Sequence, residues 1–243
     1  MTLKGTISKV AKSIVSAIFI VAICLQTPVA YREYIRGIAE DNSVRIVGMD
    51  GMGTGFHVRT KSGKVYILTN KHVCNMTGPL KVERYGDKVG VVRKVIKMYE
   101  KHDLCVMEAL PGVKGISLSS DDAKNGDHVY TLGNPRGDNL NVAEGEKFDN
   151  KVITIGENVN SNGLCTEGTL VEIPTLFGVF KICSVDRMAI QISNPTYPGN
   201  SGSAVVNRWG RLIGVIFAGS REVENQGFAV GLAEVNDFIN SLK

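Results

Sequence analysis

No two of the five cysteines are spaced as C-x-x-C, which argues against a structural zinc site. The sequence predicts neither a metal nor an organic cofactor. Cys105 lies in the apolar run LCVM, where we expect a free thiol that packs as a small hydrophobe. Cys165 and Cys183 flank one irregular region and could be joined outside the cytoplasm, but their spacing alone leaves both the bridged and the free state open.

Strongly basic or acidic stretches are also absent. The formal net charge is +4, but three of the 28 basic residues lie in the first thirty positions, which hold none of the 24 acidic residues. The remainder of the chain is therefore close to neutral. A nearly neutral body argues against nucleic acid as the main partner.

A long membrane-spanning run is missing as well. Residues 13–25 (SIVSAIFIVAICL) follow three lysines, but a spanning helix usually needs about 20 apolar residues, and this run approaches that length only if Gln26, Thr27 and Pro28 are counted and it continues to Ala30. An apolar helix behind a basic flank, with the small residue Ala30 after it, fits residues 1–30 either as a cleaved secretory signal or as a retained anchor. If it is retained, residues 13–30 would hold the protein in the membrane. The lysines favour a cytoplasmic N-terminus and an exported body.

From residue 43 onward, short β-type runs alternate with turn sequences. KVYILTN, LCVMEAL and RLIGVIFA are examples of the runs, and KSGK, KNGD and NPRGD are examples of the turns between them. About a dozen short strands at this spacing predict an all-β barrel or sandwich over residues 43–243, with residues 31–42 as a linker. The chain ends on a predicted helix whose apolar stripe is Val235, Phe238, Ile239 and Leu242.

The run TYPGNSGSAVV (196–206) places Ser201 in a glycine-rich turn. A serine nucleophile needs a base to take its proton, a carboxylate to orient that base, and donors for the oxyanion that forms. Gly199 and Gly202 can adopt backbone angles that are closed to other residues. The N–H groups of Gly199 and Ser201 could therefore point the same way and form an oxyanion hole. G-x-S-G alone is a weak signal, because such turns are common.

Candidates for the base and the carboxylate lie earlier in the chain. Of the four histidines, His72 follows the apolar run VYILTN and opens a short turn, so its ring is delivered at a strand end. His57 lies inside a strand-like run, where a surface or satisfied core role is expected. Asp103 begins the apolar run DLCVME, where a carboxylate is costly unless a partner satisfies it. His72 is a candidate partner for Asp103.

In this order the residues resemble the chymotrypsin/trypsin-like serine proteases, and most closely their HtrA (high-temperature-requirement) branch. The resemblance covers about residues 43–243 and is carried by GTGFHV, YILTNKHV, DLCVME, GDHVYTLGNPRG, AIQISNPTYPGNSGSAVVNRWGRLIGVI and GFAVGLAEVNDFI. It implies a double six-stranded β-barrel with the active site in the cleft between the barrels. It also implies that His72 is the general base, that Asp103 orients it and that Ser201 attacks, with the N–H groups of Gly199 and Ser201 as the oxyanion hole.

The sequence departs from this family in several places. Ser203 and Ala204 replace the glycine and proline that commonly follow the serine loop. Cys74 resembles the cysteine after the histidine in trypsin, but no cysteine lies on the preceding strand to pair with it. The sequence stops after one helix, so we expect a protease domain without the PDZ domain that is usual in HtrA proteins.

The resemblance also implies a pocket for the substrate side chain before the cleaved bond. Its expected walls carry no charge, which favours cleavage after a small or medium aliphatic residue such as Val, Ala or Leu. The alternative is that some of these residues belong to the ordinary core. The expected wall residues are Pro195, Ile216, Phe217, Ala218, Phe228 and Ala229.

These patterns together predict a serine endopeptidase that acts on polypeptide substrates through an acyl-enzyme intermediate. Its expected location is outside the cytoplasm, either periplasmic or secreted, or membrane-anchored with the protease domain outside. Two alternatives stay open. One is a catalytically inert pseudo-protease that binds peptides. The other is a viral or phage polyprotein-processing protease, because TYPGNSG also resembles the T-x-x-G-x-S-G loops of some positive-strand RNA virus proteases.

Overall fold

The computed structural model describes most of the chain from residue 28 onward. The predicted apolar helix within residues 1–30 falls almost entirely outside the described residues. Among the helices that are described, none is long and apolar enough to cross a membrane. The described ranges are 28–87, 89–134, 140–159, 162–165, 168–175, 178–220 and 223–242.

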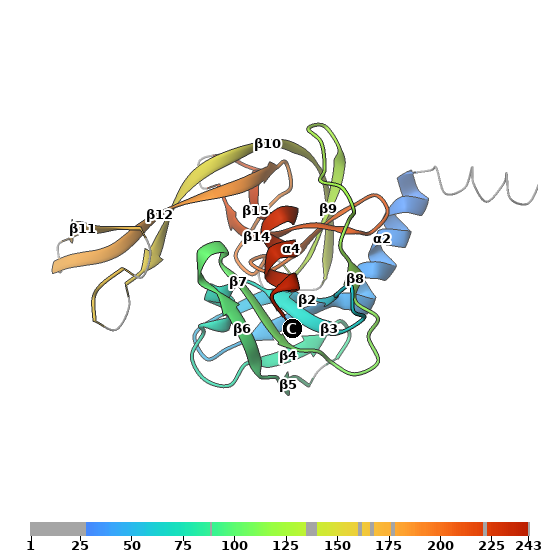
Figure 1. Cartoon of the computed structure of the whole chain (residues 1–243), viewed down its shortest axis with the longest axis horizontal. Helices are drawn as coiled ribbons and strands as arrows, with labels where there is room; N and C mark the ends of the chain where they lie inside the picture. The colour runs from blue at the N-terminus through green and yellow to red at the C-terminus, as the bar shows by residue number, and fades with distance from the viewer. Residues whose placement is uncertain are drawn as a thin grey trace, which may run out of the picture.

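The chain is mostly β and forms two curled sheets, one from each half of the sequence (Figure 1). The first sheet has eight strands in the order β5-β4-β1-β2-β3-β7-β6, with β8 paired to β2. β2 is buried along six consecutive positions because it lies between neighbours on both sides and under the helices. The strands are β1 (Ser43–Val47), β2 (Met52–Arg59), β3 (Val65–Thr69), β4 (Lys81–Arg84), β5 (Val91–Val92), β6 (Val95–Tyr99), β7 (Leu104–Glu108) and β8 (Ile116–Ser117).

The second sheet has seven strands in the order β10-β9-β13-β14-β15-β12-β11, and β10 also pairs with β12. This extra pairing closes the path, and β11 lies outside it. The sequence analysis expected two six-stranded barrels. The structure has two curled sheets, but the described sheets contain eight and seven strands. The strands are β9 (His128–Gly133), β10 (Asn141–Asn158), β11 (Thr169–Thr175), β12 (Gly178–Ile192), β13 (Ala204–Asn207), β14 (Leu212–Gly219) and β15 (Gly227–Gly231).

β10 and β12 continue together beyond the body of the second sheet and form a two-stranded arm with β11 at its tip (Figure 1). All seven residues of β11 are exposed. On the facing strand β12, Cys183 and Val185 are buried, but neither they nor any residue of β11 belongs to a hydrophobic core cluster.

The main core fills the space between the sheets. Phe56 and Leu104 of the first sheet pack in one cluster with Leu132 and Leu212 of the second. The predicted C-terminal helix is present as α4 (Leu232–Asn240). Its Phe238 is fully buried and stacks on Tyr99 of β6, with the ring centroids 5.2 Å apart. α4 therefore follows the second sheet in the chain but also packs on the first.

Residues 31–42, expected as a linker, are helical and belong to the folded body. They lie in α2 (Pro28–Asn42), whose Ile35 and Ala39 are fully buried against the main core. The Tyr34 hydroxyl donates a hydrogen bond to the carbonyl of Trp209 at 3.2 Å. The position of this segment before the first β-type run suggested a linker, but its few apolar residues fall on one face and can be buried.

The cysteine prediction was wrong for Cys105, which is not a free thiol. Cys105 of β7 forms a disulfide with Cys74, although the preceding strand offers Cys74 no partner. The aspartate strand supplies the partner instead. A second disulfide joins Cys165 and Cys183 near the tip of the arm. The sequence had left both the bridged and the free state of this pair open.

Candidate active site

Two short turns at neighbouring strand ends hold His72 and Asp103. β3 ends at Thr69, and the single-turn helix α3 (Lys71–Cys74) follows at once and carries His72. Asp103 lies between the 3-10 turn η1 (Glu100–His102) and β7. Because β3 and β7 are paired, with Thr69 opposite Cys105, the two turns meet at the same edge of the sheet.

His72 and Asp103 are joined at two points. The Asp103 carboxylate accepts a hydrogen bond from His72 Nδ1 at 2.7 Å and another from the His72 backbone N–H at 3.0 Å. Asp103 is 5 % exposed, whereas half of the His72 side chain is exposed to solvent. Because Nδ1 is engaged with the carboxylate, Nε2 is the ring nitrogen that can accept a proton from another group.

The loop between β12 and β13 (residues 193–203) carries Ser201 and is called the serine loop here. It is held by Thr54, the third residue of β2. The Thr54 backbone N–H donates to the Ser201 carbonyl at 2.8 Å, and its hydroxyl donates to the Gly199 carbonyl, also at 2.8 Å. The same hydroxyl accepts a bond from the backbone N–H of Asn134 at 3.0 Å. A fully buried threonine of the first sheet therefore fixes a loop of the second sheet.

Two glycines give this loop its shape. Gly199 has φ 95° and Gly202 has φ 86°, and both values belong to the region that favours glycine. A Cβ on Gly202 would collide with the Thr54 carbonyl and the Thr69 hydroxyl. The glycine at 202 is thus required both by its φ and by the close approach of the first sheet.

Gly53 is where the serine loop and α3 approach each other. A Cβ on Gly53 would lie 2.7 Å from a methyl of Val73, which follows His72, and 3.3 Å from the Ser201 carbonyl. The structure thus brings His72, Asp103 and the Ser201 backbone to the same region. Within the described part of the chain, no hydrogen bond links the Ser201 hydroxyl to His72. Catalytic contacts of this kind are often long before substrate binds.

The expected pocket residues divide into two groups. Ile216 and Ala229 are fully buried and pack together in the core of the second sheet. Pro195 and Ala218 are partly exposed, and Phe217 and Phe228 are 6 % and 9 % exposed. On β14 and β15, Ile216 lies opposite Ala229 and Ala218 lies opposite Phe228, with a register shift between the two pairs, and Phe217 and Phe228 pack in the main core cluster.

Sequence reasoning missed Thr196, which follows Pro195 and lies beside expected pocket residues. A Cβ on Gly219 would be 3.0 Å from the Thr196 Cβ, and a Cβ on Gly227 would meet the Thr196 hydroxyl. Gly219 and Gly227 are opposite each other on β14 and β15. Thr196 therefore occupies the space that these paired glycines leave open. The only sequence signal for Thr196 was that Gly219 and Gly227 flank β-type runs.

His57 has the satisfied core role that was one of its two expected roles. It is 1 % exposed, its Nδ1 lies 2.9 Å from the Asn42 carbonyl, and its Nε2 accepts the Leu110 backbone N–H at 3.2 Å. Burial lowers the pKa of His57, and the positive charges of Arg84 and Arg93 lower it further, while the hydrogen bond to Asn42 acts in the opposite direction. The ring is therefore neutral and structural.

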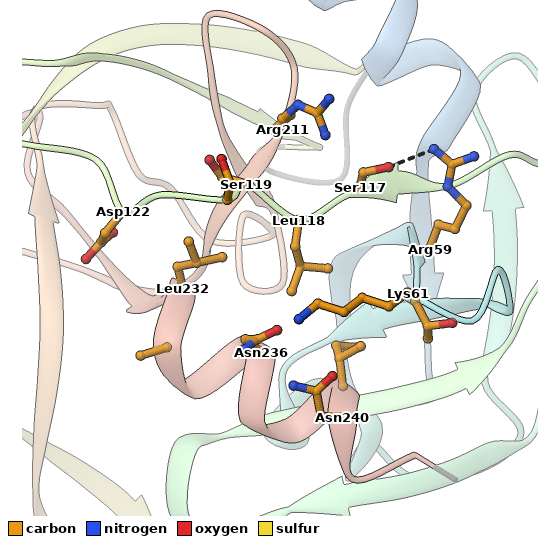
Figure 2. Close-up of a pocket in the computed structure, with 14 residues that line it drawn as sticks. Arg59, Lys61, Ser117, Leu118, Ser119, Asp122, Arg211, Leu232, Asn236 and Asn240 are labelled. Atoms are coloured by element: carbon orange, nitrogen blue, oxygen red, sulfur yellow. Dashed lines mark hydrogen bonds between the residues drawn. The ribbon is translucent and has the colours of Figure 1, made fainter.

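A cavity of about 710 Å³ lies elsewhere, between the first sheet and α4 (Figure 2). Arg59 is the last residue of β2, Lys61 lies in the turn after it, and Asn236 and Asn240 come from α4; Arg59 donates to the Ser117 hydroxyl at 2.7 Å. None of the expected site residues lines this cavity. In the described ranges, no cluster of three or more His, Cys, Asp or Glu side chains could hold a metal.

Comparison with known proteins gives a consistent result. A model of the family described as trypsin-like peptidase domain matches residues 53–215, a span that includes His72, Asp103 and Ser201. A curated Staphylococcus aureus (strain USA300) protein named serine protease HtrA-like is 30% identical over 204 residues, which cover 80% of this chain. The match covers 24% of that protein, so the chain spans about a quarter of the length of the curated relatives it matches.

Solved structures show the same fold at lower identity. The active form of the Rv3671c protease from M. tuberculosis aligns with a TM-score of 0.64 and 20% identity, over 87% of this chain and 85% of that one. The serine endoprotease from Yersinia pestis aligns with a TM-score of 0.65 and 21% identity, over 89% of this chain and 68% of that one. At this identity the likeness concerns the fold.

Proposed function

The chain belongs to the trypsin-like peptidase domain family, and from this we propose that it is a serine endopeptidase whose nucleophile is Ser201. The observation that carries the proposal is the two-point hydrogen bonding between His72 and Asp103, at the strand edge where Thr54 holds the Ser201 loop. A structural role alone would not require an exposed imidazole on a buried carboxylate.

In the proposed reaction, His72 Nε2 takes the proton of the Ser201 hydroxyl as its oxygen attacks the carbonyl carbon of the scissile bond. Asp103 keeps the proton on Nδ1 and stabilises the imidazolium that forms. The carbonyl oxygen becomes an oxyanion, which the N–H groups of Gly199 and Ser201 stabilise. Neither of these two N–H groups donates to another described backbone group, which supports this role.

The second half of the reaction releases the products. The imidazolium gives its proton to the leaving amine, the C–N bond breaks, and an ester of Ser201 remains. Water then loses a proton to His72 and attacks the ester, and the same proton returns to Ser201 as the acid product leaves. Protons balance over the cycle, and the histidine ends as it began.

We propose a preference for small or medium aliphatic residues before the cleaved bond. Thr196 supports this because it fills space between Gly219 and Gly227 and so leaves a shallow pocket. The surrounding Pro195, Phe217, Ala218 and Phe228 supply no carboxylate for a basic side chain. Ile216 and Ala229 support the pocket from the core behind it.

Polypeptides are the proposed substrates, and the proposed location is outside the cytoplasm. Two disulfides support this location, since disulfides persist mainly in oxidising compartments. Residues 13–30 would either be removed as a signal or hold the domain at the membrane. The domain boundaries proposed from the sequence are kept, except that residues 31–42 are counted with the folded body.

A fluorophosphonate probe tests the proposed nucleophile. It should phosphonylate the purified wild-type chain at Ser201, as read by peptide mass spectrometry, and should not label Ser201→Ala. Ser203→Ala is the matched control, because Ser203 is close in the chain but fully buried, and this variant should label like the wild type. A folded wild-type chain that resists the probe, or a Ser201→Ala variant that labels normally, would contradict the proposal.

A further inference from the structure

The Cys74–Cys105 disulfide joins the two turns that carry His72 and Asp103. Cys74 is two residues after His72 and is the last residue of α3, and Cys105 is two residues after Asp103 in β7. The sequence separation of 31 is the same for the disulfide and for the hydrogen-bonded pair. The disulfide therefore links the same two segments as the His72–Asp103 hydrogen bonds, two residues further along each segment.

The hydrogen-bonded pair needs external support because both segments are locally weak. Asp103 has φ 51° and ψ 44°, a left-handed conformation that is unfavourable for residues other than glycine. α3 contains four residues, which is too short for a helix to be stable alone. The Asp103 carbonyl accepts bonds from Lys71 N–H at 3.1 Å and Asn70 Nδ2 at 3.0 Å, so the two turns also support each other.

The disulfide is an internal part of the fold. Cys74 is 6 % exposed and Cys105 is fully buried, and both pack in the core of the first sheet with Val73, Ile67 and Met107. The bridge therefore joins the last residue of α3 to β7 inside the core of the first sheet, whereas half of the His72 side chain is exposed to solvent.

We propose that the Cys74–Cys105 disulfide is a positioning element for the His72–Asp103 pair, and that the chain reaches its full rate only when this bridge is formed. The inference rests on the proposed function, because it assigns the bridge a role in that reaction. Neither cysteine touches the reacting atoms; the bridge acts through the orientation of the imidazole.

The chain contains its own control. Cys165–Cys183 links the segment before β11 to β12 on the arm, and none of the candidate catalytic residues lies in those elements. Removing it costs one disulfide, as removing Cys74–Cys105 does, but leaves the segments around His72 and Asp103 intact. A general effect of losing a disulfide would appear in both variants.

The first experiment compares the full chain with Cys74→Ala/Cys105→Ala and with Cys165→Ala/Cys183→Ala, using a fluorogenic peptide. We expect kcat to fall about tenfold or more in the first variant with KM within about twofold, because small displacements of catalytic groups can cost about a hundredfold. The second variant should stay within about twofold of the wild type. An unchanged kcat in the first variant, or equal losses in both, would overturn the inference.

A double-mutant cycle separates positioning from general destabilisation. If the bridge acts through the His72–Asp103 pair, the cysteine substitutions should lower kcat by less than about twofold in an Asp103→Asn background, where the pair is already impaired. Equal fold losses in the two backgrounds would show that the bridge acts independently of the pair and would overturn the inference.

A redox titration of the wild-type chain keeps the inference testable if the cysteine variant does not fold. A water-soluble phosphine reduces each bridge to two thiols; the phosphine takes oxygen from one water molecule, and the two hydrogens of that water end on the sulfurs. Alkylation and mass spectrometry then give the reduced fraction of each bridge. Activity should fall with reduction of Cys74–Cys105 and not with that of Cys165–Cys183. Activity that follows Cys165–Cys183, or neither bridge, would overturn the inference.

The outcomes also distinguish failure of this inference from failure of the proposed function. A folded, fully oxidised wild-type chain that neither reacts with the fluorophosphonate nor cleaves peptides would overturn both. An active wild-type chain whose rate is insensitive to Cys74–Cys105 would overturn the positioning role alone.

Discussion

The hydroxyl of Thr54 donates a hydrogen bond of 2.8 Å to the carbonyl of Gly199, which lies 145 residues later in the chain. Through this bond and its own N–H, one threonine of the first sheet holds both ends of the Gly199–Ser201 segment of the second. With Gly199 C=O held in place, the orientation of the neighbouring peptide groups is restricted. The proposed oxyanion hole therefore depends on contact between the two sheets.

Replacing Thr54 by valine should impair the reaction more than binding. The side-chain shape is kept, but the Asn134 N–H and the Gly199 carbonyl lose their partner, which costs about 1–3 kcal/mol for each buried group left unsatisfied. We expect a lower kcat with little change in KM. Thr54→Ser keeps the hydroxyl and should restore most of the rate. If valine and serine variants behave alike, the hydroxyl has no positioning role.

Substitutions in the proposed triad should have large and unequal effects on turnover. Ser201→Ala or His72→Ala should reduce kcat by several orders of magnitude, and Asp103→Asn by roughly ten-thousandfold, because an amide favours the wrong imidazole tautomer. Single-turnover kinetics with a peptide ester measure this, and circular dichroism checks that the fold is kept. Full activity of any of the three variants would exclude the mechanism.

Gly202 and Gly63 form a matched pair for testing the serine loop. Both have positive φ, 86° and 83°, but a Cβ meets no atom within 4 Å at Gly63 and collides with the Thr54 carbonyl at Gly202. Gly63→Ala should cost about 1–2 kcal/mol of the free energy of unfolding from its φ alone. Gly202→Ala should cost at least about 3 kcal/mol, because the collision adds to the backbone strain. Urea denaturation compares the two, and equal losses would contradict the close approach.

Thr196→Gly should enlarge the proposed pocket. Removing the side chain between Gly219 and Gly227 should raise kcat/KM for peptides with Phe before the cleaved bond, relative to Ala, by roughly tenfold, which is a typical gain for filling apolar space. Thr196→Val keeps the volume and should keep the wild-type preference. A peptide library read by mass spectrometry would reveal the shift, and an unchanged profile in the glycine variant would remove Thr196 from the pocket.

His57 predicts a loss of stability in mild acid. Its pKa is lowered in the folded chain, chiefly by burial, so the unfolded chain binds more protons as the pH falls below the ordinary histidine value of about 6.5. The stability is fully present above that pH and decreases as the pH falls toward the folded pKa. His57→Gln should be less stable throughout but should lose less between about pH 7 and about pH 5. Urea midpoints at the two pH values measure this, and an equal decrease in both proteins would contradict it.

The sequence was informative where a residue type is required by local chemistry. Short apolar runs between glycine-rich turns predicted a β-rich fold, and the stripe ending at Leu242 predicted α4. His72 and Asp103 could be paired from sequence because a carboxylate at the start of a buried strand needs a partner. The roles of these residues and of Ser201 in catalysis stay predictions.

Other features depend on contacts that no local pattern encodes. Cys74 finds Cys105 because β3 pairs with β7, and a strand pairing cannot be read from cysteine spacing. Thr54 looked like an ordinary strand residue in GTGFHV, and its role arises only when the second sheet lies against it. Residues 31–42 were interpreted as a linker from their position between the apolar segment and the first β-type run, and the burial of Ile35 and Ala39 depends on a surface formed much later in the chain.

Because α2 is packed on the body through Ile35, Ala39 and the Tyr34 hydroxyl, the segment that follows the N-terminal residues is part of the folded body. α2 therefore provides no unstructured spacer between those residues and the serine loop. If the preceding residues are held in a bilayer, the active site would lie at a restricted distance and orientation relative to the lipid. Only those parts of neighbouring proteins that extend to that distance would then be cut.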